Sequence, residues 1–289
     1  MKTVVHKSTI PIDQMFVVRE LRDKYFDPTW HAHSEFQLFV VLEGTGTRFI
    51  GDNIKTFKPG ELILTGPHLP HLWRSDEAYF SKSEVLAIHG IVLYLNEHFL
   101  GEQALQKEEL VMVKKLLAKS KKGLEFFGES KEQVIQLLKA LIPLKGIDRV
   151  IVLLQLLKVL ATAKDCQFIS HSDYGDPVKA VETDRTNIVY AYVLKNFRRK
   201  IILQEVAALV HMTPTSFSRY FTRNSNKNFS AFVAEVRIRQ ACKLLVETEE
   251  PIEAICYDCG FNTLSNFNKQ FRELMADNPS SYRKKFMAL

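Results

Sequence analysis

The sequence predicts a two-domain α+β protein, in which a β-barrel with a helical extension precedes an all-helical domain made of two similar halves. Three observations predict this fold class. Short β-branched and aromatic runs fill residues 10–92, helical periodicity continues to residue 165, and a helix-turn-helix pattern occurs twice in the last hundred residues. We therefore expect a first domain over 1–165, with its helical segment at about 93–165, a linker over 166–183 and a second domain over 184–289.

The strands of the first domain are predicted by runs such as FQLFVVLEG and GELILTG, which are rich in β-branched and aromatic residues. Glu43-Gly44, Gly51-Asp52-Asn53 and Lys58-Pro59-Gly60 are turn sequences between these runs. Many short strands with frequent turns predict an antiparallel barrel or sandwich.

Three runs then carry apolar residues at three- and four-residue spacing: ELVMVKKLLAKS, KEQVIQLLKALIPL and IDRVIVLLQLLKVLATA. The last run has Leu153, Leu154, Leu157 and Leu160 along one side, which is more apolar than a single packed face requires. A dimer contact and burial against the barrel explain it equally well. Residues 166–183 lose the periodicity and collect Ser, Asp, Gly and Pro, as linkers do.

No segment is apolar over the roughly 18 residues of a membrane span, and the N-terminus lacks a signal-peptide pattern. We therefore expect a cytoplasmic protein without a membrane partner. Cys256-x-x-Cys259 is a candidate redox or metal pair, but no second Cys or His pair follows at zinc spacing. The favoured interpretation is two small buried hydrophobic residues on a short helix.

The repeated pattern lies in Gln204–Arg223 and again in Glu253–Glu273. Phe217 corresponds to Phe267 and Phe221 to Phe271, each at a separation of 50 residues. A short helix, a tight turn and a second helix form a unit that places its second helix in a DNA major groove. Two copies therefore predict contact with two grooves.

The charge distribution favours the same partner. Residues 184–289 contain 16 Lys and Arg against 10 Asp and Glu, whereas residues 1–183 contain 23 of each sign. The whole excess of +6 therefore lies in the C-terminal third, as expected for a domain that binds a polyanion. A basic surface without a partner is the alternative, which the duplicated motif disfavours.

Thr213-Pro214 and Thr263 are the predicted starts of the two second helices, because Thr caps a helix and Pro suits its first position. Phe217, Tyr220 and Phe221 then share one face of the first helix, and the opposite face carries no acidic residue. Such polar, hydrogen-bonding faces suit base edges in a major groove.

The segment IEAICYDCGFNTLSNFNKQFRELMADNPSSYR resembles the signature of the AraC/XylS family of bacterial transcription regulators. The framework positions of that family are present: Gly260, Phe261, Phe267, Phe271, Pro279, Tyr282 and Arg283. The resemblance covers both repeats and implies two helix-turn-helix units joined by a long helix. It also implies a sequence-specific, effector-responsive activator that binds a double-stranded operator, acts as a homodimer and works with RNA polymerase.

By family position, the residues expected to read bases are Thr215, Ser218, Arg219, Ser265, Asn268 and Lys269. Those expected to approach phosphates are Pro214, Ser216, Arg223, Asn266 and Arg283. A helix over 230–247 would be roughly 27 Å long at about 1.5 Å per residue. It could hold the two reading helices one DNA turn apart, so that each monomer reads two successive major grooves. Asn226 and Ala276 stand where the family commonly has Gly, and Ala276 suggests an altered turn.

The stretch from Trp30 to Trp73 resembles the cupin-type sensor domain of many such regulators. In that fold His31, His33 and His71 would converge, and Gln37 falls near the glutamate of metal-binding cupins. Three interpretations stay open: a Zn, Fe or Mn site formed by the histidines, histidines bonded to the backbone, and an effector site. The effector site would draw on Trp30, His31, His33, Gln37, Arg48, His71 and Trp73.

The missing carboxylate and the family's use of organic effectors disfavour the metal. We predict no cofactor, no catalytic residue and no metal, with a small polar effector, for which a sugar is one candidate. The alternative function is a metal-dependent cupin enzyme with a basic appendage. The duplicated DNA-reading unit argues against it, because such an enzyme has no need of one.

Overall fold

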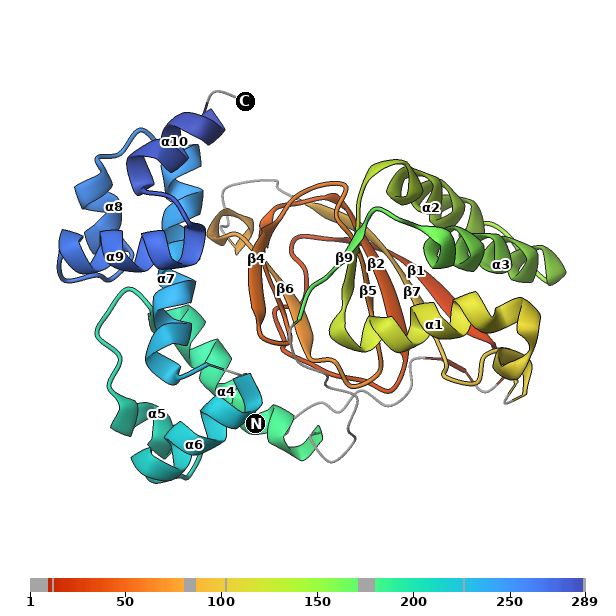
Figure 1. Ribbon diagram of the computed structural model, residues 1–289, viewed down its shortest axis with the longest axis horizontal. Helices are drawn as coiled ribbons and strands as arrows, with labels where there is room; N and C mark the ends of the chain where they lie inside the picture. Colours follow the sequence, from red (N-terminus) through yellow and green to blue (C-terminus); the bar gives the residue numbers. More distant parts are fainter. Residues whose placement is uncertain are drawn as a thin grey trace. The chain divides into compact units, whose positions relative to one another are not determined.

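The structure is a computed structural model that describes residues 10–11, 13–80, 87–101, 103–170, 180–225 and 227–287. Apart from Ile54–Thr56, the chain divides into two compact units whose boundary lies between Thr183 and Asp184 (Figure 1). Among these described residues, no helix has the length and apolarity that a membrane crossing demands. Each unit is described separately below.

The first unit contains two antiparallel sheets that form a barrel-like pair of layers (Figure 1). The larger sheet has the order β1-β7-β2-β5-β8-β9 and the smaller one β4-β3-β6. The larger sheet consists of β1 (Phe16–Asp23), β2 (Phe36–Glu43), β5 (Leu62–Thr65), β7 (Ile88–Leu95), β8 (Leu124–Phe126) and β9 (Cys166–Phe168). The smaller sheet consists of β3 (Gly46–Ile50), β4 (Asn53–Phe57) and β6 (His71–Ser75). The predicted antiparallel β-rich domain is confirmed.

Side chains of β2 alternate between two apolar layers, because successive residues of a strand point to opposite faces. Leu38 and Val40 belong to the cluster between the large sheet and the helices. Phe39 and Val41 belong to the cluster inside the barrel. Since both faces of β2 are covered, the strand reads as one continuous apolar run rather than as an alternating one.

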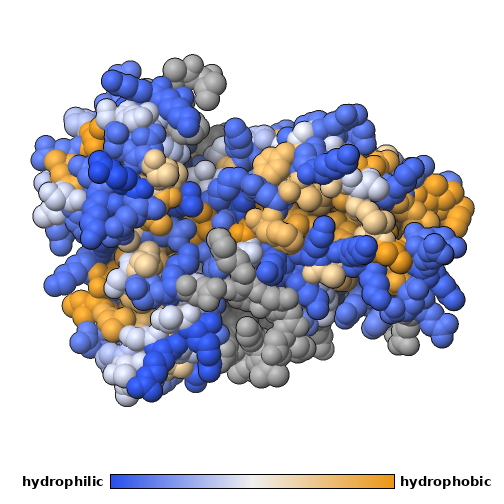
Figure 2. Space-filling view, viewed as in Figure 1, coloured by the Kyte–Doolittle hydropathy of each residue, from blue (hydrophilic) through white to orange (hydrophobic). Residues whose placement is uncertain are grey.

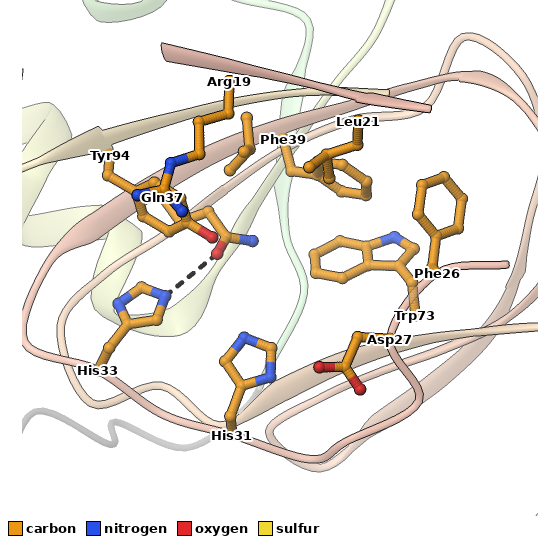
Figure 3. A pocket seen from close by; sticks show the side chains of 11 residues that line it. Arg19, Leu21, Phe26, Asp27, His31, His33, Gln37, Phe39, Trp73 and Tyr94 are labelled. Atoms are coloured by element: carbon orange, nitrogen blue, oxygen red, sulfur yellow. Dashed lines mark hydrogen bonds between the residues drawn. The ribbon is translucent and has the colours of Figure 1, made fainter. Parts of the chain in front are cut away.

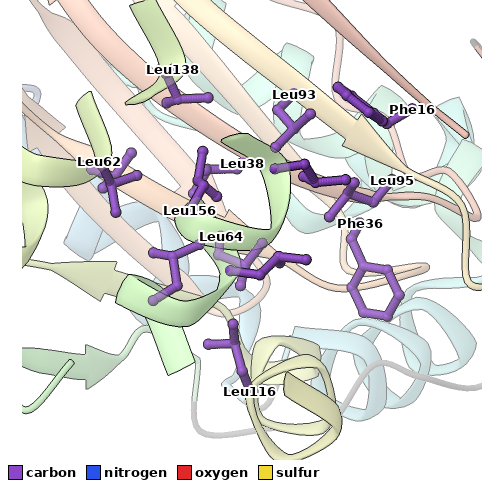
Figure 4. Close-up of a cluster of buried hydrophobic side chains, with 14 of the residues drawn as sticks. Phe16, Phe36, Leu38, Leu62, Leu64, Leu93, Leu95, Leu116, Leu138 and Leu156 are labelled. Atoms are coloured by element: carbon purple, nitrogen blue, oxygen red, sulfur yellow. The ribbon is translucent and has the colours of Figure 1, made fainter. Parts of the chain in front are cut away.

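Three helices cover the outer face of the large sheet: α1 (Val111–Lys119), α2 (Gly128–Leu141) and α3 (Ile147–Thr162). Figure 4 shows leucines of these helices meeting leucines of β2, β5 and β7. Short 3-10 turns lie between the larger elements at Glu77–Phe80, Ala104–Gln106, Glu108–Leu110 and Ser120–Lys122. The helical segment starts later than the predicted residue 93, because β7 continues to Leu95.

The leucines of helix α3 differ in burial, which shows what most of them pack against. Leu153, Leu157 and Leu160 are buried in the sheet-facing cluster, whereas Leu154 remains 40% exposed. Burial against the barrel therefore explains three of the four leucines. The outer face keeps a separate apolar stripe that packing within the unit does not cover.

The segment predicted as a linker over 166–183 begins with ordered structure. Residues 166–168 form the edge strand β9, in which Gln167 lies opposite Glu125 of β8. The amides of Ile169 and Ser170 donate to the carbonyls of Gly123 and Lys122. A three-residue edge strand is too short to give a periodic sequence signal. Residues 171–179 lie outside the described residues, so a linker there stays a prediction.

The second unit is all helical, as predicted. Its helices are α4 (Ala180–Asn196), α5 (Leu203–Leu209), α6 (Pro214–Ser225), α7 (Phe229–Glu247), α8 (Ile252–Asp258), α9 (Leu264–Met275) and α10 (Pro279–Met287). Helices α5 and α6 form the first helix-turn-helix unit and α8 and α9 the second. The long helix α7 joins them (Figure 1).

Each half of this unit has its own aromatic core. In the first, the rings of Phe217 and Phe221 each lie 5.3 Å from that of Phe229. In the second, Phe267 and Phe271 are fully buried together with Cys256 and Cys259. All four cysteines are free, and burial raises the pKa of Cys259 to about 12. The fold therefore supports the interpretation of Cys256 and Cys259 as two small buried hydrophobic residues.

The turn after α9 has alanine where glycine is usual, as expected. Ala276 adopts a left-handed conformation with φ of 54° and terminates α9 through its amide, which donates to the carbonyl of Arg272. Alanine accepts this conformation at a cost of about 1 kcal/mol. Asn226, the corresponding departure in the first unit, lies outside the described residues.

Candidate functional site

The two second helices, α6 and α9, begin in the same way. The amide of Ser216 donates to Thr213 Oγ1 over 3.2 Å, and the amide of Asn266 donates to Thr263 Oγ1 over 3.3 Å. These side-chain caps satisfy amides that have no partner within the helix. Because both caps sit at the same position relative to the buried phenylalanines, the outer faces of α6 and α9 begin in register.

The outer faces of α6 and α9 carry the residues predicted to contact DNA. Thr215, Ser216, Arg219 and Arg223 are exposed on α6, while Pro214 and Ser218 are half-buried. Ser265, Asn266, Asn268 and Lys269 are exposed on α9. Lys269 Nζ lies 4.0 Å from Glu273 Oε1, an exposed pair that holds the cation only weakly. The structure thus presents both predicted sets on helix surfaces.

Arg283 has a different environment from the other predicted phosphate contacts. Its guanidinium donates to the carbonyl of Leu245 over 3.1 Å and to that of Glu250 over 2.6 Å. These carbonyls lie at and beyond the C-terminal end of α7, where a cation also offsets the helix dipole. Arg283 therefore fixes the joint between α7 and the second helix-turn-helix unit.

A cavity of about 240 Å³ opens inside the barrel of the first unit (Figure 3). It is lined by Arg19, Leu21, Phe26, Asp27, His31, His33, Gln37, Phe39, Trp73, Val92 and Tyr94. Arg19, Gln37, Tyr94 and His33 gather at one end, and Phe26, Trp73 and the carboxylate of Asp27 lie at the other (Figure 3). The cavity therefore has one polar end and one aromatic end that also holds a carboxylate.

Four of the seven residues predicted for an effector site line this cavity: His31, His33, Gln37 and Trp73. His71 lies directly behind them, fully buried, with its ring 4.6 Å from that of His31 and 5.0 Å from that of His33. Backbone hydrogen bonds in both directions between His31 and His71 bring these two segments together.

The other two predicted residues, Trp30 and Arg48, do not line the cavity. Trp30 is buried beside Phe49. Arg48 is buried in an ion-pair network, where its guanidinium lies 2.9 Å from both Glu61 and Glu125. A buried arginine needs such partners, so Arg48 has a structural role. The sequence could not reveal this role, because Glu61 and Glu125 lie on other segments of the chain.

Arg19, Asp27 and Tyr94 are the polar lining residues that the sequence did not suggest. Arg19 lies on β1, Asp27 follows that strand, and Tyr94 on β7 lies opposite Gln37 in the β2–β7 register. The signal missing from the sequence was the order of strands in the sheet, because β7, which is far from β2 in the sequence, lies between β1 and β2. Burial raises the pKa of Tyr94 to about 12, so its hydroxyl stays a hydrogen-bond donor at neutral pH.

The three histidines share one hydrogen-bonding pattern. Their Nδ1 atoms face backbone carbonyls, those of Thr29 at 2.8 Å, Glu35 at 3.0 Å and Leu69 at 2.7 Å. One ligand atom from each ring lies within 4.8 Å of the others. Burial, then the nearby His31 and His33, hold the pKa of His71 well below its usual range. Three imidazole nitrogens are a ligand set that divalent transition metals bind in proteins.

Comparisons with known proteins agree with this arrangement. A family described as a helix-turn-helix domain matches residues 206–285, and a cupin domain matches residues 21–79. The first match contains α6, α7 and α9, and the second contains β2 to β6. The chain therefore carries a cupin domain followed by an AraC-type helix-turn-helix domain.

Two curated Bacillus subtilis (strain 168) proteins illustrate the relationship, both named uncharacterized HTH-type transcriptional regulators. YdeC is 28% identical over 109 residues, which cover 38% of this chain and 38% of YdeC. YfiF is 21% identical over 261 residues, covering 90% of this chain and 80% of YfiF. The alignments with YdeC and with YobQ, a third Bacillus subtilis protein of the same description, span 38% and 39% of those proteins, well under two thirds of their length.

Among solved structures, fatty-acid-bound ToxT from Vibrio cholerae strain SCE256 aligns over 95% of this chain and 96% of its own. The identity is 15% and the TM-score 0.37.

Proposed function

We propose that this protein is an effector-responsive, sequence-specific DNA-binding regulator of transcription of the AraC/XylS family. One observation carries the proposal: helices α6 and α9 bury their phenylalanines and present short polar side chains and one or more cations outward. These faces lie in the part of the chain that holds all of its excess positive charge. Such faces match the donor and acceptor pattern of a DNA major groove.

The proposed contact has two reading helices per chain. Thr215, Ser218 and Arg219 on α6 would read one groove, and Ser265, Asn268 and Lys269 on α9 the next. Helix α7 has 19 residues and is therefore about 28 Å long, close to one turn of DNA. Pro214, Ser216, Arg223 and Asn266 would approach phosphates, and Arg283 would act chiefly by holding the second unit in place.

The effector is a small molecule that the barrel cavity encloses. Its polar end offers Arg19, Gln37 and Tyr94, and its aromatic end offers the faces of Phe26 and Trp73. A compound with several hydroxyls and one apolar face, such as a sugar, fits this division. Binding there would shift the population of DNA-binding states, and we propose activation through RNA polymerase as the outcome.

The chain acts as a homodimer through the outer face of α3. Ile147, Ile151 and Leu154 are 69%, 48% and 40% exposed and are spaced as one helical stripe. Ile142, which directly follows α2, is also exposed, and Figure 2 shows hydrophobic residues gathered at the α2–α3 end of the first unit. The partner is a second copy of the chain, which packs the same apolar stripe against this one. This pairing matches the two surfaces in chemistry and gives the two-fold symmetry of most dimers.

The histidine cluster is the observation that favours the second candidate function, a metal-dependent cupin enzyme. We do not adopt it, because the curated relatives are named as transcriptional regulators and the reading helices have no role in such an enzyme. Stoichiometric metal together with turnover of a substrate would reverse this choice.

The test is selection of bound sequences from a random pool of duplex DNA by the full chain, at physiological salt with nonspecific competitor. We expect an enriched motif with two short blocks one helical turn apart. Binding that depends only on salt, with no enriched sequence, would contradict the proposal. Lys119→Ala, an exposed cation of α1 in the first unit, is the matched control for variants of the reading helices.

A further inference from the structure

The side-chain amide of Gln37 lies between two of the three clustered histidines. The amide atom that Figure 3 draws as the oxygen, Oε1, is 3.1 Å from His33 Nε2 and 3.2 Å from His71 Nε2. We propose that this amide takes the place of a metal ion, and that the histidines form a latent divalent-metal site which one carboxylate at position 37 would open. The inference concerns the pocket of the proposed effector but does not depend on DNA binding.

The hydrogen bonds of the imidazoles fix their tautomers. A backbone carbonyl is only an acceptor, so each Nδ1 that faces one must carry the hydrogen. A neutral imidazole with Nδ1–H has a lone pair on Nε2. His33 and His71 therefore both present lone pairs to Gln37.

The orientation of the amide follows from those lone pairs. The position of an amide group does not by itself distinguish its oxygen from its nitrogen. An oxygen between the two Nε2 atoms would require both to carry hydrogens, making His33 and His71 adjacent imidazolium ions in a buried site. An amide nitrogen has two hydrogens and can give one to each lone pair. The NH2 group of Gln37 therefore faces the histidines.

This arrangement uses the lone pairs that a metal ion would need. A tetrahedral ion with bonds of about 2.1 Å holds its nitrogens roughly 3.4 Å apart, which is closer than the 4.8 Å span of this cluster. Binding a metal would thus require the amide to leave and the rings to approach. A glutamate at position 37 has no hydrogens to donate, and its negative charge favours a cation between it and the histidines.

The proposal is tested by Co²⁺ binding to the full chain as wild type, Gln37→Glu and Gln167→Glu. Gln167 is exposed on β9, so the last variant adds the same charge away from the cluster. We expect Gln37→Glu to bind Co²⁺ at least about tenfold more tightly than the other two and to show the visible absorption of coordinated Co²⁺. Wild type that binds as tightly as Gln37→Glu, with loss of binding in His71→Ala, would show that the amide does not replace the metal.

A folded Gln37→Glu chain, judged by circular dichroism, that binds no Co²⁺ would also overturn the proposal. If that variant does not fold, Gln37→Leu replaces it, because leucine removes the donors while keeping a similar volume. Gln37→Leu should then bind Co²⁺ more tightly than wild type, and equal binding would contradict the proposal. Nitrogen-15 NMR of labelled histidines adds a direct check: His33 and His71 should carry hydrogen on Nδ1 alone, and hydrogen on Nε2 would refute the amide orientation.

Discussion

Gly260 lies directly against the carbonyl oxygen of Phe197, and a β-carbon added to this glycine would stand 2.5 Å from it. The same atom would stand 2.7 Å from the carbonyl of Arg198. Gly260 also has φ of +83°, in the region that favours glycine. The turn between α8 and α9 thus rests on the end of α4, which places the second helix-turn-helix unit.

Gly260→Ala should lower the free energy of unfolding of the second unit by about 2–4 kcal/mol, since backbone strain and the steric clash add. Urea unfolding followed by circular dichroism measures it. Gly146→Ala is the control, because Gly146 also has positive φ but no atom lies within 4 Å of its added carbon. Gly146→Ala should lower the free energy of unfolding of the first unit by only about 1–2 kcal/mol. Equal losses would show that the contact with Phe197 contributes nothing.

Arg219→Ala and Lys269→Ala should each weaken binding to the selected operator by about 1–3 kcal/mol and relax specificity at one position only. The two relaxed positions should lie one helical turn apart. Titration of DNA variants with each protein measures this. A loss of the same size on every sequence would instead assign that cation to a phosphate.

A ligand of the barrel cavity should change the fluorescence of Trp73, which lines it, but not that of Trp30, which does not. The chain has only these two tryptophans, so Trp30→Phe and Trp73→Phe separate their signals. A screen of sugars and other small polar compounds should give a response in Trp30→Phe alone. A hit should bind Tyr94→Phe about fivefold more weakly, whereas the exposed Tyr25→Phe should have no effect. A response that Trp73→Phe keeps would place the ligand elsewhere.

At pH 8 the native chain should be alkylated first at the partly exposed Cys166. Burial raises the pKa of Cys242 to about 11 and that of Cys259 to about 12, so both remain protonated and shielded. Peptide mass spectrometry after iodoacetamide treatment measures the order of modification. In urea all four should react alike. Rapid native labelling of Cys259, or a disulfide between it and Cys256, would restore the redox interpretation.

Ile151→Glu should convert a dimer into monomers, because it places a charge within the apolar stripe of α3. Analytical ultracentrifugation at micromolar concentration measures the change. Gln136→Glu, an exposed change on α2, should leave the dimer intact. Wild type that sediments as a monomer would rule out the proposed interface.

The sequence was informative where a local pattern fixes the structure. Threonine caps, buried phenylalanines fifty residues apart and a charge excess confined to one region predicted the second unit with its reading faces. The residues that share a helix face follow from the 3.6-residue period alone, so these predictions did not require knowing which other elements pack against the helix. Arg283 is the exception, since its carbonyl partners belong to residues 33 and 38 positions earlier in the chain.

In the barrel, composition and motifs predicted the strand-rich segments, the turns and, through resemblance to a cupin, the approach of His31, His33 and His71. They gave no sign that Arg48 pairs with buried glutamates or that Tyr94 from β7 lines the cavity beside Gln37. A strand's neighbours are set by sheet order and register, which combine segments far apart in the sequence. A side chain's partners, and therefore its chemistry, follow from that pairing.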